Sequence, residues 1–155
     1  MGILGILGSV AKGAVSQMSQ QQYQQNRNTK LGGKTVDQWD RTERGIGVLG
    51  NLQGNLSNLS GYVGIYKAYY NGELVYIGRA VEYANGGFRK RLTDYVRESD
   101  SGRGTGSSSK MHEHRNQIRI GVIVVGDDYE AAQITKKLEV MLIGKYRPKW
   151  NVQFK

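Results

Sequence analysis

The chain has 155 residues, a mass of 17.3 kDa and a formal net charge of +9, with 22 Lys and Arg against 13 Asp and Glu. Its length is enough for one modest hydrophobic core. The basic balance favours an acidic partner, with nucleic acid first and an anionic membrane surface second. The chain has no cysteine, which excludes a disulfide scaffold, a thiolate zinc site and a cysteine nucleophile.

The composition of the chain changes near Leu59. Residues 1–60 hold few aromatic side chains and many Gly, Gln, Asn and Ser, and nearly all the aromatic residues follow. We expect residues 1–60 to be a Gly- and Gln-rich, helical or linker-like segment that serves targeting, adaptor binding or oligomerisation. Residues 61–155 are expected to form the folded domain. The stretch NLQGNLSNLS over 51–60 is interpreted as a linker with a weak leucine spacing.

The first residues are apolar, with glycine at every third position up to Gly8. The run is too short for a membrane span, which needs about 20 apolar residues, and it lacks the basic start of a secretory signal. We interpret it as a helix docked on its own domain or on a second copy of the chain, which leaves a homo-oligomer open. The alternative is a trafficking or membrane-contacting segment. The expected location is the cytoplasm, with no transmembrane span.

Beyond Gly61 the hydrophobic pattern predicts a β-β-α-(α)-β-α order. The expected elements are a strand over 62–70, a return strand over 73–78, a helix over 88–97, a Gly/Ser loop over 99–109 with a short helix from Ser108 or Ser109, a strand over 118–126, a helix capped by Asp127 or Asp128 and ended by Pro148, and an extended tail over 150–154. These elements predict an α/β domain with a small, three-stranded, antiparallel or mixed sheet flanked by helices.

The first two strands form a hairpin around Asn71-Gly72. A three-residue loop places Tyr66 opposite Tyr76. Alternation then gives an apolar face and a second face with two phenols beside residues that lack side chains. The apolar face holds Val63, Ile65, Val75 and Ile77, and the other holds Gly64, Tyr66, Tyr76 and Gly78. A two-residue turn would place the tyrosines on opposite faces, so the clean apolar face favours the longer loop.

The two tripeptides of this hairpin carry a family resemblance. Gly64-Ile-Tyr66 followed by Tyr76-Ile-Gly78, then a basic helix, a helical glutamate and an asparagine, resembles the GIY-YIG nuclease family. The resemblance covers residues 61–154, and the segments ELVYIG, FRKRL and PKWNVQF look most similar to the phage endonuclease II branch. It implies the GIY-YIG fold and gives no support to the residues before Gly61.

The resemblance also implies roles for individual residues. Tyr66 resembles the tyrosine that acts as general base or orients the attacking water, and Tyr76 the second tyrosine, assigned to water positioning or proton relay. Arg91 matches the arginine that holds the scissile phosphate, and Tyr95 the place where members carry His or Tyr. Glu139 matches the glutamate that binds one Mg²⁺ or Mn²⁺ ion.

Three further positions follow from the same resemblance. Gly64 and Gly78 match the motif glycines, and Asn151 matches the asparagine that braces the site. Lys110 loosely resembles a lysine of the middle helix in the endonuclease II branch.

Physical chemistry agrees with several of these roles. A guanidinium such as that of Arg91 can bind phosphate in a bidentate way, and Tyr95 lies one turn later on the same helix face. Glu139 borders an apolar helix stripe, where a partly solvated carboxylate suits one hard divalent ion that keeps most of its waters. A phenol has a pKa of about 10. Tyr66 can therefore act as a base near neutral pH only if Arg91, Lys90 or the metal favours its phenolate.

The remaining basic residues could follow a DNA backbone without reading its sequence. They are Arg79, Arg89, Lys90, Arg97, Arg103, Arg115 and Lys149. His112 and His114 invite a metal interpretation, but two residues apart on a helix they point in different directions and cannot chelate, whereas on a strand they could. A basic, partly exposed histidine pair near DNA is the favoured interpretation.

The leading hypothesis is a divalent-metal-dependent endonuclease that hydrolyses DNA phosphodiester bonds by a one-metal mechanism. One alternative uses the same chemistry in an antibacterial DNase toxin, delivered into a target cell by a secretion system. Such a toxin would need an immunity protein, and residues 1–60 would serve export or adaptor binding. A second alternative is a nucleic-acid-binding module that has lost catalysis.

Overall fold

A computed structural model describes residues 20–97 and 106–153 of the chain. The expectations for the apolar N-terminus and for most of the Gly/Ser loop lie outside these residues, as does Arg103. Within the described ranges, no helix combines the length and the apolar character that a membrane crossing requires.

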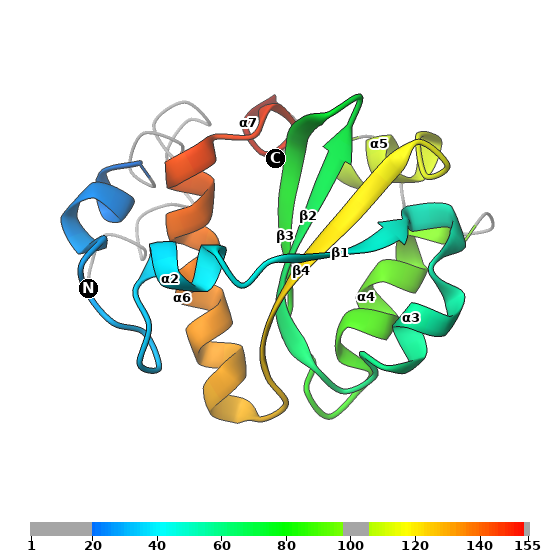
Figure 1. The fold of residues 1–155 in the computed structure, drawn as a ribbon. Helices are drawn as coiled ribbons and strands as arrows, with labels where there is room; N and C mark the ends of the chain where they lie inside the picture. The colour runs from blue at the N-terminus through cyan, green and yellow to red at the C-terminus, as the bar shows by residue number, and fades with distance from the viewer. Residues whose placement is uncertain (1–19, 98–105, 154–155) are drawn as a thin grey trace.

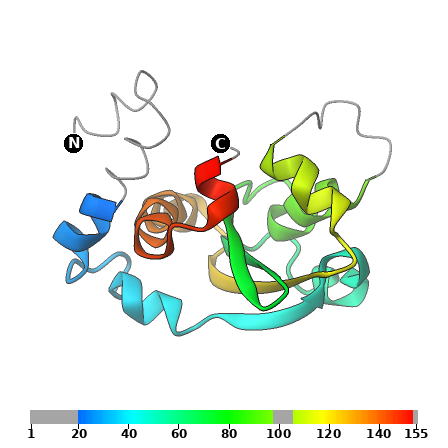
Figure 2. The same cartoon turned by 90° about the horizontal axis from the view of Figure 1, so that it is seen from above.

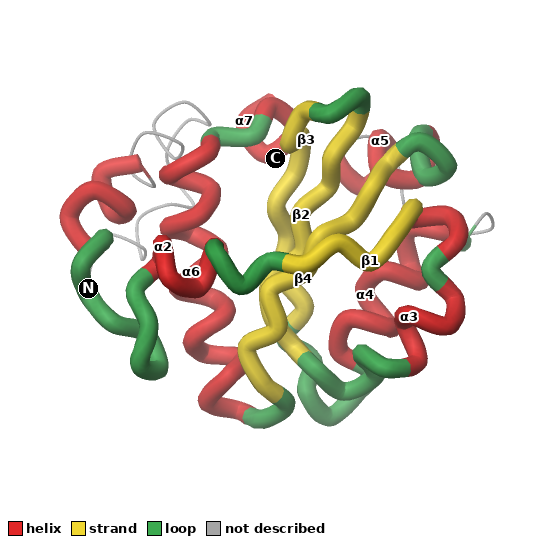
Figure 3. The backbone as a smooth tube through the Cα atoms, viewed as in Figure 1, coloured by secondary structure: helices red, strands yellow, loops and turns green. Residues whose placement is uncertain are grey.

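Four antiparallel strands form a single sheet in the order β1-β4-β2-β3, with helices against both faces (Figures 1 and 3). The named elements are α2 (Val36–Asp40), β1 (Arg44–Val48), η2 (Leu49–Asn51), α3 (Gln53–Ser57), β2 (Val63–Tyr70), β3 (Glu73–Ala80), α4 (Gly87–Val96), α5 (Ser107–Glu113), β4 (Ile118–Gly126), α6 (Tyr129–Tyr146) and α7 (Lys149–Gln153). The α/β architecture and the flanking helices confirm the predicted fold class.

The sheet has four strands rather than the predicted three. The additional strand, β1, lies before Gly61 and pairs with β4, so that Gly45 lies opposite Gly121. The stretch interpreted as a linker forms η2 and α3, and its leucines are buried in the core. The leucine spacing was the signal of this packing, and the many polar residues between the leucines obscured it.

Two hydrophobic clusters cover the two faces of the sheet. One contains Tyr66 and Ile120 and packs against Phe88 and Leu92 of α4 and Met111 of α5. The other joins Ile65, Ile77 and Ile123 to Leu138 and Leu142 of α6 and to Trp39 of α2. Figure 2 shows α6 on one side of the sheet and α4 and α5 on the other.

The boundaries of α6 follow from local chemistry. The side chain of Asp128 accepts a hydrogen bond of 2.9 Å from the backbone N–H of Ala131, which satisfies one of the free donors of the first turn. Arg147 adopts a left-handed conformation at the other end, and Pro148 follows. The tail after Pro148 was predicted to be extended and is instead the short helix α7, because its buried Trp150 packs against the core.

The turn of the β2–β3 hairpin has two residues, and the prediction of a three-residue loop is wrong. Asn71 and Gly72 both have positive φ, 53° and 79°, which is the geometry of a type I′ turn. Tyr70 pairs directly with Glu73 across this turn.

A β-bulge corrects the register that such a turn would impose. Leu74 pairs with Tyr69 and Tyr76 pairs with Ala68, which leaves Val75 as the extra residue of β3. The bulge moves Val75 to the cluster that contains Tyr66. It also places Tyr76 on the same face as Tyr66, as predicted. Tyr66 does not lie opposite Tyr76, however, because it pairs with Gly78 and Tyr76 pairs with Ala68.

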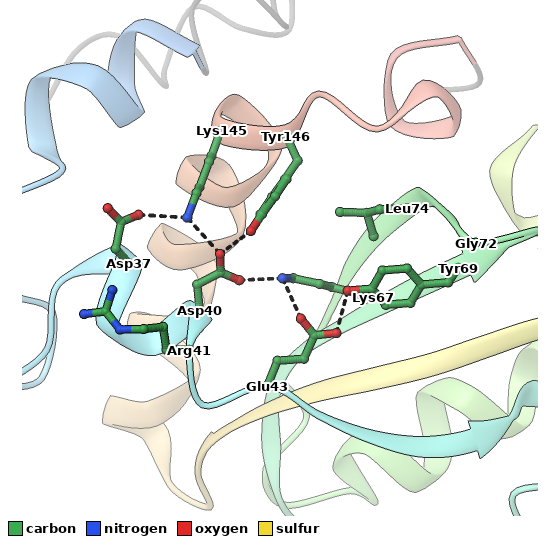
Figure 4. Close-up of a pocket in the computed structure, with 10 residues that line it drawn as sticks. All are labelled: Asp37, Asp40, Arg41, Glu43, Lys67, Tyr69, Gly72, Leu74, Lys145 and Tyr146. Carbon is green, nitrogen blue, oxygen red and sulfur yellow. Dashed lines mark hydrogen bonds and ion pairs between the residues drawn. The ribbon is translucent and has the colours of Figure 1, made fainter.

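A buried ionic network joins α2, β2 and α6 on the other face of the sheet (Figure 4). The side chain of Lys67 is only 2% exposed, and its Nζ bonds to Asp40 and, at 2.8 Å, to Glu43. Lys145 binds Asp40 at 2.8 Å and Asp37 at 2.9 Å, and the Tyr146 hydroxyl also donates to Asp40. The network lines a pocket of about 560 Å³. It was not predicted, since its members lie far apart in the sequence.

Asp40 is the centre of this network. Burial alone would raise its pKa, but hydrogen bonds from Lys145, Lys67 and Tyr146 outweigh burial, and the pKa of Asp40 lies below its ordinary value. A carboxylate with a lowered pKa stabilises the folded state above the pKa of the unfolded chain, about 4. That stabilisation is lost as the pH falls through the lower folded pKa.

We expect Asp40→Asn to lower the free energy of unfolding by about 3 kcal/mol at neutral pH, because it leaves buried ammonium groups without a counter-charge. The variant should also lose less stability than the wild type when the pH falls below about 4. Urea unfolding followed by circular dichroism at several pH values measures both effects. Asp127→Asn, which changes an exposed carboxylate, is the control; an Asp40→Asn chain with the acid slope of the wild type would contradict the assignment.

Candidate active site

Tyr66 lies at the centre of the sheet, and its ring rests directly on Gly78. The two residues pair across β2 and β3. A Cβ atom at position 78 would lie 2.2 Å from the Tyr66 ring, so only glycine permits this contact. Gly64 is restricted in the same way, because a Cβ there would lie 2.0 Å from the carbonyl oxygen of Ile123 in β4. The two motif glycines therefore allow close packing in the centre of the sheet.

Three tyrosines share a chain of hydroxyl contacts. The hydroxyl of Tyr66 lies 2.5 Å from that of Tyr95 on α4. Side-chain hydrogen bonds also join Tyr76 to Tyr95 and to Ser107 at the start of α5. The ring centroid of Tyr66 lies 6.2 Å from that of Tyr76 and 5.9 Å from that of Tyr95. Sequence reasoning missed Ser107, which follows a Gly/Ser loop and carries no motif of its own.

The tyrosines differ in their access to solvent. Tyr66 is 2% exposed, and burial raises its pKa well above the ordinary value; Tyr95 and Tyr76 add to this rise, and the charge of Arg91 opposes it. Tyr76 is only partly buried. Burial raises the pKa of Tyr76 as well, while the hydrogen bond with Ser107 opposes the rise. The charge of Arg91 does not lower the pKa of Tyr66 enough to offset burial, so Tyr66 is a neutral phenol at neutral pH.

Arg91 lies on α4 one turn before Tyr95, and its charge acts on Tyr66, Tyr76 and Tyr95. Its guanidinium lies 3.7 Å from Glu82. In the ranges that the structure covers, its buried Nε has no hydrogen-bond partner. An unsatisfied buried donor is unfavourable, and a phosphate oxygen would satisfy it.

Glu139 lies on α6 beside the edge strand β3. Its side chain is 14% exposed, and its Oε1 lies 3.4 Å from Nη1 of Arg79. Its charge also acts on Tyr76, so the carboxylate approaches the tyrosines from the other side of the sheet. The interaction with Arg79, predicted only to bind DNA, could not be read from the sequence because 60 residues separate the pair.

The donor set around Glu139 suits one hydrated divalent ion. Among the described residues, no group of three or more His, Asp or Glu side chains could hold a metal. Mg²⁺ often binds through one or two carboxylates and keeps several waters, so a single partly exposed carboxylate beside a phenol fits that ion.

Asn151 on α7 holds the edge strand next to the tyrosine motif. Its Oδ1 accepts a hydrogen bond of 2.8 Å from the backbone N–H of Ile77, and its Nδ2 donates to the carbonyl of Ile77 at 2.9 Å. The side chain is 3% exposed. Its amide thus pairs with both backbone groups of Ile77, as a neighbouring strand would. Asn151 is therefore a positioning residue for β3 between Tyr76 and Gly78.

The two histidines point to different partners. Nδ1 of His112 lies 2.8 Å from the backbone oxygen of Tyr95, which ties α5 to α4. His114 packs against Tyr70 and Trp150. The structure does not bring them together as a pair, and Lys110 on the same helix lies 4.0 Å from Glu113.

The other predicted DNA-contacting residues are spread over the surface. Lys90 lies 2.9 Å from Glu82, Arg97 lies 3.7 Å from Asp94, and Lys149 lies 3.3 Å from Glu73. Arg115 bonds to the backbone of His112, and Arg89 is exposed. Exposed ion pairs such as those of Lys90 and Lys149 are weak and do not prevent a contact with a phosphate group.

A family model of the UvrC-like GIY-YIG domain matches residues 62–152. The chain belongs to the GIY-YIG family. This membership supports a nuclease activity of the GIY-YIG type and agrees with the site that the structure assembles. The resemblance to the phage endonuclease II branch stays a prediction.

The relatives are longer proteins, of which this chain matches a small part. The UvrABC system protein C of Francisella tularensis subsp. holarctica and that of Francisella philomiragia subsp. philomiragia are each 30% identical to this chain over 106 residues. The match covers 68% of this chain and 15% of each relative. No solved structure matches the chain.

The two hydrogen bonds between Asn151 and the backbone of Ile77 predict the effect of Asn151→Ala. Removing the amide leaves the N–H and carbonyl of Ile77 unpaired, so we expect a loss of about 2 kcal/mol in the free energy of unfolding. The amide of Ile77 should also exchange faster with solvent, as NMR hydrogen exchange would show. Asn151→Asp keeps an acceptor but no donor, and should protect this amide better than alanine does. Unchanged exchange at Ile77 in Asn151→Ala would contradict the bracing role.

Proposed function

We propose that this chain is an endonuclease that hydrolyses phosphodiester bonds of DNA with the help of one divalent metal ion. The proposal rests on one observation: Tyr76, Arg91 and Glu139, which come from three different elements, interact electrostatically at one edge of the sheet. Phosphodiester hydrolysis needs an in-line water, a cation against the developing charge and help for the leaving oxygen.

In this proposal Arg91 binds the scissile phosphate. Its unpaired Nε and its position beside the tyrosines suit a bidentate contact with two phosphate oxygens. Glu139 holds Mg²⁺ or Mn²⁺. When bound, such an ion supplies charge neutralisation at the phosphate and stabilises the leaving oxygen.

The tyrosines orient the attacking water. Its oxygen bonds to phosphorus as the bond to the leaving oxygen breaks, and the proton that it loses passes to solvent water. Tyr76 is the more accessible of the two motif phenols, and the charge of Glu139 acts on its pKa, so we assign it the contact with the water. Tyr66 is almost fully buried and bonds to Tyr95, which supports a role for Tyr66 in fixing the position of the Tyr95 hydroxyl and as the packing partner of Gly78. This assignment reverses the emphasis that the family resemblance places on Tyr66.

Glu139→Gln should reduce the cleavage of supercoiled plasmid DNA by about 100-fold or more, because the metal-binding charge is lost. Cleavage by the wild type should require Mg²⁺ or Mn²⁺ and stop with EDTA. Glu130→Gln, on the first turn of the same helix, is the matched control and should cut like the wild type. A folded, DNA-binding wild-type chain that cuts nothing would overturn the proposal and favour the inactive binding module.

Arg91→Lys should lower the cleavage rate by about 10- to 100-fold, because an ammonium cannot make the bidentate contact. Arg89→Lys makes the same substitution two residues earlier on an exposed side chain, and should change the rate less than about twofold. Single-turnover cleavage with saturating enzyme separates this loss from weaker binding. Equal rates for the two variants would contradict the role of Arg91.

The biological setting stays a prediction. Action in the cytoplasm and delivery as a toxin use the same site and differ in their partners: an immunity protein and an export adaptor for a toxin, or another copy of the chain. Toxicity on expression that disappears in Glu139→Gln would favour the toxin.

A further inference from the structure

Three aromatic side chains form a cluster on the face of the sheet that carries Tyr76. The His114 ring centroid lies 4.6 Å from that of Tyr70 and 6.0 Å from that of Trp150. Trp150 is buried, and the side chain of His114 is 22% exposed. Two neighbouring rings fix the plane of the imidazole, so that its polar atoms have a defined position.

The imidazole has no hydrogen-bond acceptor of its own. Its Nε2 lies 3.7 Å from Oε2 of Glu113, which is longer than a hydrogen bond. Between the residues that the structure describes, no hydrogen bond to a ring nitrogen of His114 is formed. His112, by contrast, uses Nδ1 to bind the backbone of Tyr95. The side chain of His114 is 22% exposed, so a ring nitrogen can bind a ligand.

Helix α5 connects this ring to the proposed active site. Ser107, Met111 and His114 are separated by four and three residues, so they share the helix face that packs on the sheet. Ser107 bonds to Tyr76, and Met111 is fully buried. His114 lies seven residues beyond Ser107, about 10 Å along the helix axis. That separation is larger than the rise of one nucleotide along a duplex, so Tyr76 and the His114 ring can contact different phosphates of one strand.

Basic residues flank the ring-bearing residues along the chain. Lys110 lies at the flank of the same helix face and is 38% exposed. Arg115 follows His114 in the chain, and Lys149 precedes Trp150. The acidic neighbours Glu113 and Glu73 are both more than half exposed, where solvent screens their charge.

We propose that His114 is a DNA-binding residue that donates a hydrogen bond to a backbone phosphate beside the scissile one, with Tyr70 and Trp150 holding its ring in place. This inference rests on the proposed function, because it takes Tyr76 as the reacting end of the track. It gives α5 a defined task, which is to carry the DNA strand from the tyrosines toward the hairpin turn. It also explains why the imidazole is stacked rather than hydrogen-bonded within the protein.

The test compares two substitutions of His114 whose effects on DNA binding differ in opposite ways for a packing role and for a donor role. His114→Phe keeps an aromatic ring but removes the N–H, and His114→Gln keeps an N–H donor but removes the ring. Binding to a fluorescein-labelled DNA duplex is measured by anisotropy in chains that all carry Glu139→Gln, so that no cleavage is needed. Thermal unfolding of each variant is recorded alongside. Lys30→Gln, an exposed cation next to the α6 side of the sheet, is the control and should bind within about twofold of the parent.

We expect His114→Phe to weaken DNA binding by about fivefold or more with unchanged thermal stability. His114→Gln should bind within about twofold of the parent even if it unfolds at a lower temperature. Tight binding by His114→Phe, or a chain that binds no DNA at all, would overturn the inference. A wild type that does not cut, combined with weaker binding by His114→Phe, would overturn the proposed function and leave only the contact of His114 with DNA, without its place beside a scissile bond.

Discussion

The contact between the Tyr66 ring and Gly78 is the constraint on which the site depends. It requires that the two residues lie opposite each other on β2 and β3, and the two-residue turn alone would not align Tyr76 with them. The bulge at Val75 adds one residue to β3, which shifts the register and brings Tyr76 to the same face as Tyr66. The turn, the bulge and Gly78 therefore depend on one another. A change in the turn or the bulge would place the two tyrosines on different faces, and a side chain at position 78 would force the Tyr66 ring away from the sheet.

A second constraint comes from the buried ammonium of Lys67. It follows Tyr66 in β2 and faces α6, and its counter-charges Asp40 and Glu43 both precede the region that matches the family model. A buried charge without its partner is strongly destabilising. The matched region is thus electrostatically incomplete without the segment before it. The same segment supplies β1, which covers the edge of β4, and so it contributes both charge and backbone pairing to the sheet.

Much of the fold could be predicted from the sequence, because strand alternation and helix periodicity are local signals. The strand over 118–126 and the helix after Asp128 lie where the pattern places them. The bulge at Val75, the strand β1 and the network around Asp40 could not be predicted in this way. Each depends on a partner far away in the chain: Val75 on the opposite strand, Gly45 on β4, and Asp40 on Lys67 and Lys145. The motif resemblance predicted Tyr76 and Glu139 as site residues. Their partners Ser107 and Arg79 follow only from the packing.

The site lies at the edge of the sheet because its parts come from both faces. Arg91 and Tyr95 belong to α4 on one face, and Glu139 belongs to α6 on the other. Side chains from opposite faces can meet only beyond the last strand, and β3 is that strand. A free strand edge would normally fray or pair with another chain. Asn151 satisfies the backbone at Ile77, the one residue between Tyr76 and Gly78, and so it keeps the edge ordered without covering it. In the proposed function, an exposed but fixed edge lets a long polymer such as DNA reach Arg91 and Glu139 at once.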